Sequence, residues 1–116
     1  MALTTQLDQG EKYWTLTLGG DLDYSECTGF RLTIDRVLKH SPSCLIVDLS
    51  GIDYLDSSGL GLLLSLSKEF GADGGHLVLV TNESVDNILA LTRLSGIFSC
   101  TSTRDEAVTM LADTCG

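Results

Sequence analysis

The residues best suited to chemistry lie in one short segment, Asp56-Ser57-Ser58-Gly59-Leu60-Gly61. It combines a carboxylate, two hydroxyls and two glycines at the start of a predicted helix. A serine in such a place can act as a nucleophile, accept a modifying group or cap the helix. Because a cap of this kind contributes about 1 kcal/mol, a purely structural role stays open for Asp56, Ser57 and Ser58.

The residues around these serines do not favour catalysis. Neither serine has a glycine two positions before it, as a Gly-x-Ser-x-Gly nucleophile elbow requires. The two histidines of the chain, His40 and His76, share no motif with either serine. Gly59 and Gly61 lack the third glycine of a dinucleotide fingerprint and the lysine of a P-loop. The sequence therefore predicts no enzyme, no catalytic residue and no cofactor.

Gly59 and Gly61 in a first helical turn need a reason of their own. Glycine inside a helix costs about 1 kcal/mol relative to alanine. The pair therefore indicates that something approaches the backbone closely here, either another helix of the same chain or a partner. The small residues also leave the Ser57 hydroxyl less shielded, as a modifying enzyme would need.

The overall charge excludes one class of partner. The 116 residues include 7 Lys and Arg against 16 Asp and Glu, a formal net charge of −9. Such a chain cannot release counterions from nucleic acid, so we expect no direct nucleic-acid binding.

The longest strongly apolar stretch, residues 60–64, is far shorter than a bilayer span of about 20 residues. The first residues lack the pattern of a signal peptide, and we expect no membrane association.

Four cysteines stand far apart in the sequence: Cys27, Cys44, Cys100 and Cys115. They form no Cys-x-x-Cys pair, and only two histidines could complete a metal site, so no metal is predicted. Widely spaced thiols of this kind are typical of reduced, buried cysteines in a cytoplasmic protein. We therefore expect four reduced thiols and a cytoplasmic location.

Runs of β-type residues alternate with helix-type runs along the chain. Residues 13–18 alternate in hydrophobicity and stop at a pair of glycines, and residues 3–7 are expected to pair with them as an edge hairpin. Residues 44–49 and 76–80 are almost entirely apolar, which predicts strands covered on both faces. A short strand is expected near residues 98–101.

Helix signals lie between these strands. Asp23 and Glu26 have the spacing of a capping box, and the apolar stripe that follows them ends before Pro42. The next predicted strand is followed by a loop over residues 50–56. A second helix is then expected over residues 57–70.

The remaining helices have signals of their own. Ser84 is expected to cap a third helix that stops at Gly96, and Thr103 with Glu106 forms a second capping box before the last helix. This alternation predicts an α/β domain: a mostly parallel central sheet of about five strands with an antiparallel edge, packed by about four helices. In such sheets functional groups gather where strand carboxyl ends meet helix amino ends, and the serine segment lies there.

Residues 45–64 resemble the signature of the STAS domain, a module shared by bacterial anti-sigma factor antagonists and the cytoplasmic tails of sulfate transporters. The core Asp56-Ser57-Ser58-Gly59-Leu60-Gly61 is close to the antagonists' pattern. Gly20-Asp21-Leu22-Asp23 resembles the Gly-Glu/Asp-Leu-Asp turn before the family's first helix, and residues 85–98 are similar to its third-helix region.

This resemblance extends over nearly the whole chain. It covers about residues 10–112, so it implies a single STAS domain over residues 1–116. The transporter-tail version is not favoured, because no membrane segment is predicted. One departure from the family pattern is Arg93, where many relatives have glycine.

The resemblance also implies a function and a site. In the antagonists, the serine directly after the aspartate of Asp-Ser-Ser-Gly is phosphorylated by an anti-sigma factor that is also a serine kinase, and that residue here is Ser57. The unphosphorylated form is implied to bind this anti-sigma factor and so to release the sigma factor, whereas phosphorylation ends the binding. A PP2C-type phosphatase is expected from the family. The implied partner-binding residues are Asp23, Asp56, Ser57, Ser58, Gly59 and Gly61.

Several of these residues keep a second interpretation. Asp23 can serve as a helix cap, and Asp56 can either orient the neighbouring hydroxyl or end the loop. Ser58 fits a first-turn helix residue better than a second phosphosite. Tyr54 and Leu55 are expected to pack under the loop. A STAS module that acts as a non-phosphorylated scaffold in a signalling complex is the alternative function.

Overall fold

The computed structural model describes the backbone of residues 2–115 and the side chains of residues 2–112. Its strands are β1 (Thr4–Gln9), β2 (Trp14–Leu22), β3 (Cys44–Leu55), β4 (His76–Val80) and β5 (Ser99–Thr101). Its helices are the short 3-10 helix η1 (Tyr24–Glu26), α1 (Cys27–His40), α2 (Ser57–Ala72), α3 (Glu83–Leu91) and α4 (Arg104–Cys115).

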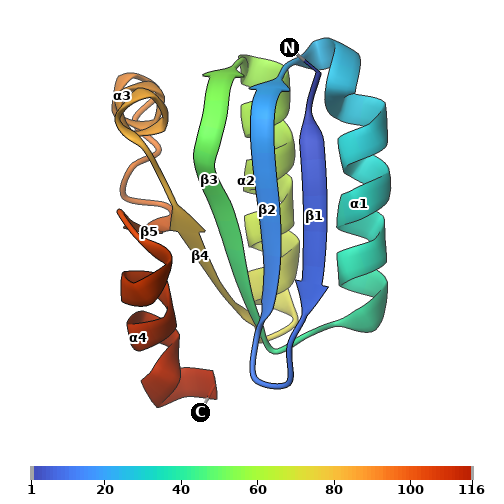
Figure 1. The fold of residues 1–116 in the computed structure, drawn as a ribbon, viewed down its shortest axis with the longest axis vertical. Helices are drawn as coiled ribbons and strands as arrows, with labels where there is room; N and C mark the ends of the chain where they lie inside the picture. The colour runs from blue at the N-terminus through green and yellow to red at the C-terminus, as the bar shows by residue number, and fades with distance from the viewer. Residues whose placement is uncertain (1, 116) are drawn as a thin grey trace.

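The strands form one five-stranded sheet in the order β1-β2-β3-β4-β5. β1 runs antiparallel to β2, and the other neighbouring pairs are parallel. In Figure 1, α2 lies behind the strands, α1 lies to the right of β1, and α3 and α4 lie beside β4 and β5. The predicted fold class is confirmed: a mostly parallel sheet with an antiparallel edge hairpin and four α-helices.

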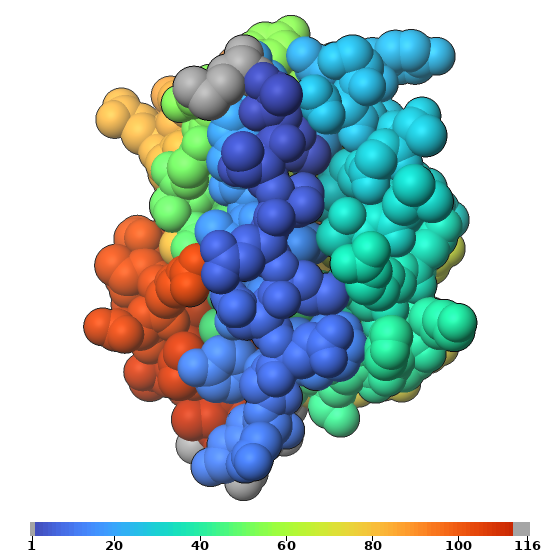
Figure 2. Space-filling view, turned by 45° about the vertical axis from the view of Figure 1, so that its right-hand side comes forward, coloured from blue at the N-terminus to red at the C-terminus, as the bar shows by residue number. Residues whose placement is uncertain are grey.

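Two apolar clusters lie on opposite faces of the sheet. The larger cluster contains Leu45 and Val47 of β3 together with residues of α1 and α2. The smaller cluster contains Cys44 and Ile46 of the same strand together with Ala107 of α4. Because successive residues of a strand point to opposite faces, β3 is buried on both sides here, as its apolar sequence predicts. Figure 2 shows β1 on the surface between α1 and α4, and most of its residues are exposed.

Both central strands are longer than the sequence predicts. β3 continues to Leu55 through most of the segment expected to be a loop (residues 50–56), and β2 continues past Gly19-Gly20 to Leu22. The two extensions pair with each other, with register shifts after Thr17 and after Gly20. Gly20 has a φ of 86°, a left-handed conformation that glycine adopts readily, so the strand bends there instead of ending.

One of the two predicted capping boxes is absent. The Oδ1 of Asp23 accepts from the amide of Ser25 at 3.0 Å and starts η1, while Glu26 makes no side-chain capping bond. The prediction was wrong because the chain enters α1 through a 3-10 turn that already uses Asp23. The cap of α4 was predicted correctly, since the amide of Glu106 donates to the Oγ1 of Thr103 at 3.1 Å.

α3 begins and ends at other residues than predicted. Its cap is Asn82 instead of Ser84, because the Oδ1 of Asn82 accepts from the amide of Val85 at 2.9 Å. The helix also ends well before Gly96, since the chain turns at Arg93, whose φ is 62°. The residue that departs from the family pattern therefore takes up the left-handed conformation that favours glycine.

The cysteines differ from the predicted set of four reduced thiols. Cys27 and Cys100 are free and half-buried, but Cys44 is disulfide-bonded, so the prediction was wrong for this residue. Cys115 lies outside the residues whose side chains are described. Spacing in the sequence does not show which thiols a fold brings together, and disulfides are rare in the reducing cytosol. The cysteines therefore no longer support the predicted cytoplasmic location.

Candidate functional site

The serine segment follows a part of β3 that projects beyond its pairing with β4. β3 pairs with β4 only from Cys44 to Asp48, whereas it pairs with β2 as far as Leu55. We call residues 50–55 the β3 arm. α2 begins at Ser57, two residues beyond the last residue of the arm. The position of the β3 arm therefore sets where the first turn of α2 lies.

Asp56 joins α2, η1 and β2 through hydrogen bonds to their backbones. Its Oδ1 accepts from the amide of Gly59 at 3.0 Å, which caps α2, and its Oδ2 accepts from the amide of Tyr24 at 3.0 Å. Its own amide donates to the carbonyl of Leu22, at the end of β2, at 3.3 Å. Both carboxylate oxygens thus bind backbone amides. Of the two roles weighed for Asp56, this geometry supports the one in which it ends the segment and caps the helix.

Ser57 is the first residue of α2, and its side chain is exposed, whereas Ser58 is half-buried. Among the hydrogen bonds between described residues, none involves the Ser57 hydroxyl. The amino end of a helix carries unpaired amides and the positive end of the helix dipole, so an anion is tolerated there. Ser57 therefore has the exposure and the surroundings that a phosphoacceptor needs, and phosphorylation stays the prediction for this residue.

The two glycines of the first turn have different surroundings. A Cβ on Gly59 would lie 2.5 Å from the carbonyl oxygen of Leu22 and 2.6 Å from its Cγ, so only glycine fits against the end of β2. A Cβ on Gly61 would meet nothing within 4 Å. The close approach at Gly59 is thus made within the chain, by a strand and not by a helix. Gly61 lies on the open surface of α2.

Asp23 lies at the same edge of the sheet, directly before η1. It accepts from the hydroxyl of Ser25 at 2.5 Å and from the amide of the same residue, and the hydroxyl's hydrogen bond lowers the pKa of Asp23 below its usual value. Burial raises the pKa of the nearby Cys27 thiol, and the negative charges of Asp56 and Asp23 raise it further. Asp23 and Asp56 therefore place negative charge close to Ser57.

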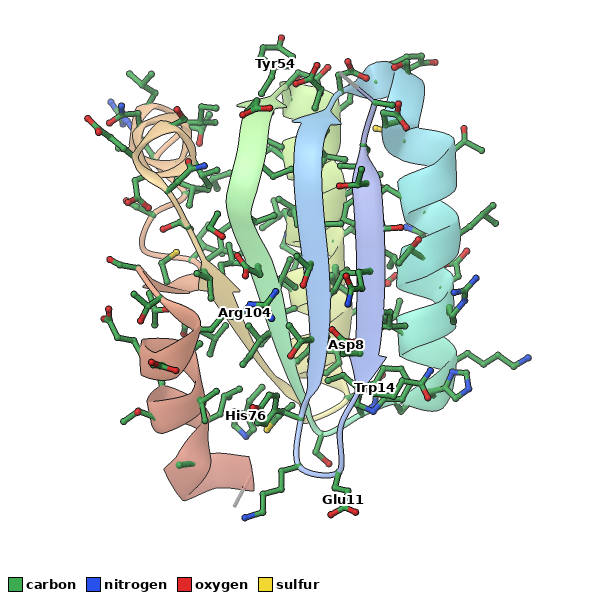
Figure 3. All side chains as sticks on the ribbon, in the orientation of Figure 1. Asp8, Glu11, Trp14, Tyr54, His76 and Arg104 are labelled. Carbon is green, nitrogen blue, oxygen red and sulfur yellow. The ribbon has the colours of Figure 1, made fainter. Side chains whose placement is uncertain are left out.

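Exposed apolar side chains flank this edge. Tyr24 and Leu32 are 79% and 66% exposed, and together with Leu62 they line a groove of about 440 Å³ on α1 and α2. Tyr54, near the end of the β3 arm in Figure 3, is 54% exposed. Tyr54 and Leu55 were expected to pack under a loop, but both belong to β3; Leu55 is buried as expected, whereas Tyr54 is exposed. Successive residues of a strand point to opposite faces, so the two side chains separate.

Asn82 holds the β3 arm, although it was not among the predicted site residues. Its Nδ2 donates to the carbonyl of Ser50 at 3.1 Å and to the carbonyl of Ile52 at 2.9 Å. An asparagine at the end of a strand is a signal for a helix cap. Its contact with the arm could not be found in this way, because Ser50 and Ile52 are distant in the sequence.

Asp48 and Arg104 form a second network at the base of the arm. The buried carboxylate of Asp48 accepts from the amide of Ser50 at 2.9 Å, from its hydroxyl at 2.6 Å and from the Nε of Arg104 at 2.5 Å. Burial by itself raises the pKa of Asp48, but the hydrogen bonds and the arginine charge outweigh it and hold the pKa below its usual value. Arg104 also donates to the Oγ1 of Thr17, so it reaches from α4 across the sheet to β2 (Figure 3).

The model of one protein family, described as the STAS domain, matches residues 5–107. The chain belongs to the STAS domain family. This STAS domain is 28% identical over 94 residues to the anti-sigma-F factor antagonist RsfB of Mycobacterium tuberculosis. The aligned residues cover 81% of this chain and 77% of the relative. It is 31% identical over 99 residues to a STAS-domain containing protein of Pseudomonas aeruginosa, which covers 84% of the chain and 97% of the relative.

Solved structures share the fold of this STAS domain. An anti-sigma factor antagonist from Mycobacterium paratuberculosis matches with a TM-score of 0.86 and 26% identity, covering 97% of this chain and 96% of the other. The unphosphorylated form of SpoIIAA matches with a TM-score of 0.79 and 22% identity over 97% of this chain and 100% of the other. At this identity, the likeness to SpoIIAA shows the fold alone.

Two further observations apply to the STAS domain as far as the structure describes it. None of its described helices is both long enough and apolar enough to cross a membrane. No group of three or more His, Cys, Asp or Glu among the described residues is arranged as a metal ion requires. The candidate site is a surface around Ser57, built from η1, the β3 arm and the first turn of α2.

Proposed function

We propose that this STAS domain is an anti-sigma factor antagonist controlled by phosphorylation of Ser57. In its unphosphorylated form it binds an anti-sigma factor with serine kinase activity, and the sigma factor is released. The observation that carries the proposal is the exposed Ser57 at the start of α2, directly after the helix cap Asp56 and at the same edge as Asp23. The relatives from the two mycobacteria support it, because both are named as anti-sigma factor antagonists.

The proposed partner-binding surface combines negative charge with exposed apolar side chains. Its charged and small residues are those implied by the family resemblance: Asp23, Asp56, Ser57, Ser58, Gly59 and Gly61. Tyr24 and Leu32 add exposed apolar area beside them. Aromatic side chains often carry a large share of the binding energy in such interfaces. The buried Gly59 contributes indirectly, since it lets α2 pack against the end of β2.

The proposed switch changes this surface without unfolding the domain. A phosphate on Ser57 adds about −1.5 to −2 charges at pH 7. Asp56 already binds the amide of Gly59, so the phosphate would lie beside a carboxylate, while the amino end of α2 partly compensates the added charge. The proposal requires that the anti-sigma factor places acidic or desolvated groups against Ser57, where a like-charge contact across the interface costs several kcal/mol. A loss of about 3 kcal/mol lowers the affinity about 150-fold, which is enough to end the binding.

The proposal assigns no catalytic role to the STAS domain itself. A PP2C-type phosphatase would restore the active form by removing the phosphate from the exposed Ser57. The domain would act in the cytoplasm, where sigma factors meet RNA polymerase, and through protein contacts without binding nucleic acid directly.

Capture of partners from a lysate of the native host tests the proposal. The baits are the wild type, Ser57→Ala, Ser57→Asp and a matched control, Thr109→Asp, with identification by mass spectrometry. Thr109 is exposed on α4, so the control adds the same charge away from the site. We expect the wild type, Ser57→Ala and Thr109→Asp to capture an anti-sigma factor with kinase activity, and Ser57→Asp to lose it.

The captured kinase and ATP should then phosphorylate the wild type and fail to phosphorylate Ser57→Ala. Equal capture by all four baits would contradict the switch and favour the alternative, a scaffold that is regulated elsewhere. Circular dichroism of Ser57→Asp checks the mechanism separately, because an unfolded variant would contradict a switch that leaves the fold intact.

A further inference from the structure

The outer side of the β3 arm lacks a neighbouring strand in the described structure. The pairing of β3 with β4 ends at Asp48 and Val80. Beyond these residues, the side of β3 that had faced β4 faces the start of α3. Carbonyls two residues apart in a strand point to the same side, so those of Ser50 and Ile52 both need a donor there.

Asn82 supplies the missing donor. Its Nδ2 donates to both carbonyls, at 3.1 and 2.9 Å, while its Oδ1 accepts from the amide of Val85 at 2.9 Å. The reversed amide would place the oxygen against two carbonyls, so these contacts define one orientation of the side chain. One residue therefore caps α3 and also takes the place of a strand beside the arm.

The backbone that carries Asn82 is itself held in place. The amide of Thr81 donates to the carbonyl of Thr101 in β5 at 2.9 Å. The buried hydroxyl of Thr81 donates to the Oδ1 of Asp86 in α3 at 2.6 Å. Asn82 thus projects from a junction that β5 and α3 both fix, which allows it to transmit position to the arm.

We infer that Asn82 is a positioning residue for the Ser57 site. It fixes the β3 arm from the side of α3, and through the arm it sets the place of Asp56, whose carboxylate holds the amides of Gly59 and Tyr24. The start of α3 is thereby coupled to the first turn of α2. The consequence for partner binding rests on the proposed function, but the coupling itself is a property of the isolated chain.

Amide hydrogen exchange, measured by NMR on the full chain, tests the coupling. Asn82→Ser keeps a capping oxygen for α3 and removes both contacts with the arm. Asn87→Ser, at an exposed position of the same helix, is the matched control. We expect the amides of Tyr24 and Gly59 to exchange about tenfold faster in Asn82→Ser, relative to amides of β4, and to be unchanged in the control. Unchanged exchange at both amides in folded Asn82→Ser would overturn the inference.

A second measurement does not depend on the folding of an Asn82 variant. Coupling between two sites acts in both directions, so a charge added at Ser57 should also change the surroundings of Asn82. In Ser57→Asp we expect the side-chain amide signals of Asn82 and the backbone signal of Val85 to shift in the NMR spectrum. Thr109→Asp, at an exposed position on α4, adds the same charge away from the site and should leave both signals in place. Unshifted signals in Ser57→Asp would contradict the coupling.

The functional consequence separates the two proposals. If the anti-sigma factor recognises the geometry around Asp56, then Asn82→Ser captures less of it than Asn87→Ser does. Where the lysate experiment fails but the exchange at Tyr24 and Gly59 changes as expected, the positioning role stands and the proposed partner is rejected. Where capture succeeds but exchange and spectra do not respond, the positioning role is rejected and the switch at Ser57 stands.

Discussion

α2 and α3 start at the carboxyl ends of neighbouring parallel strands, and their caps have nearly the same backbone. Asp56 has φ −101° and ψ 179°, and Asn82 has φ −119° and ψ 177°. Each cap oxygen accepts from the amide three residues later, which belongs to Gly59 in α2 and to Val85 in α3. The second polar atom of each cap differs, and it binds a different kind of backbone group.

The Oδ2 of Asp56 accepts from the amide of Tyr24, whereas the Nδ2 of Asn82 donates to the carbonyls of Ser50 and Ile52. An aspartate can hold only donors and an asparagine can hold both kinds of group. The choice between them therefore selects which neighbouring segment the helix start is tied to. In this fold a helix cap is also a tertiary contact.

The first turns differ in what they expose and what they bury. α2 opens with the exposed Ser57 and has the buried Gly59 at its third position. α3 opens with Glu83 and has Val85 at the corresponding place, where its side chain joins the apolar core. In α3 the Val85 side chain fills the space between the helix and the core, whereas in α2 the lack of a side chain at Gly59 lets the helix backbone pack directly against Leu22. The start of α2 thus presents a hydroxyl on a closely packed turn.

Gly59→Ala should have the largest effect on the difference between these turns. Its Cβ would lie 2.5 Å from the carbonyl oxygen of Leu22, so the backbone must shift. We expect the free energy of unfolding to fall by about 3 kcal/mol, as in a strongly overpacked core. In the matched variant Gly61→Ala, nothing obstructs the methyl group, and the same free energy should rise by up to about 1 kcal/mol. Urea denaturation measures both, and equal effects would contradict the packing described for Gly59.

Asp56→Asn gives α2 the cap type of α3. The capping oxygen can stay, but the new amide nitrogen would face the amide of Tyr24, so two donors would meet. We expect the free energy of unfolding to fall by about 1 to 2 kcal/mol. Asp53→Asn makes the same charge change at an exposed position of the β3 arm and is the control. Urea denaturation measures the free energy of unfolding of both variants. Equal values would contradict a stabilising hydrogen bond between the Oδ2 of Asp56 and the amide of Tyr24.

Acid should weaken the hydrogen-bond network of Asp48, which holds the start of the β3 arm. The pKa of Asp48 is lowered in the folded state, so its stabilisation is present above the unfolded pKa and is lost as the pH falls through the folded pKa. We expect the melting temperature of the wild type to drop below about pH 4, where aspartate ordinarily titrates, and to drop less steeply in Asp48→Asn. Arg104→Met removes the charge partner of Asp48, so the pKa of Asp48 is lowered less. This variant should melt at a lower temperature at pH 7, and its melting temperature should fall less in acid than that of the wild type. Thermal unfolding from pH 7 to pH 2 measures these effects, and parallel curves for all three proteins would contradict the assignment.

The carboxyl ends of the two helices provide the smallest expected effect. Gly74, after α2, has a φ of 81°, and Arg93, after α3, has a φ of 62°. A left-handed backbone favours glycine over other residues by about 1 kcal/mol. We expect Arg93→Gly to raise the free energy of unfolding by about 0.5 to 1 kcal/mol and Gly74→Ala to lower it by a similar amount. Destabilisation by Arg93→Gly in thermal unfolding would show that the arginine side chain makes a compensating contact.

The sequence by itself determined the features whose causes lie within a few neighbouring residues. The apolar residues 44–49 and 76–80 form strands, and α2 starts at Ser57, as predicted. The edge hairpin and the cap Thr103 were likewise predictable. Alternating burial and capping bonds act between neighbours in the chain, so their patterns can be read from it directly.

Only the tertiary structure decided the features that depend on distant segments. β3 reaches Leu55 because the extension of β2 pairs with it, and Asn82 replaces Ser84 as a cap with further contacts to the β3 arm. The disulfide bond of Cys44 and the contact of Gly59 with Leu22 have the same kind of cause. No residue's immediate neighbours reveal which remote segment will lie beside it. The serines, the cap Asp56 and the glycines of the site therefore lie in one short segment, while β2, η1 and α3 determine the position of that segment.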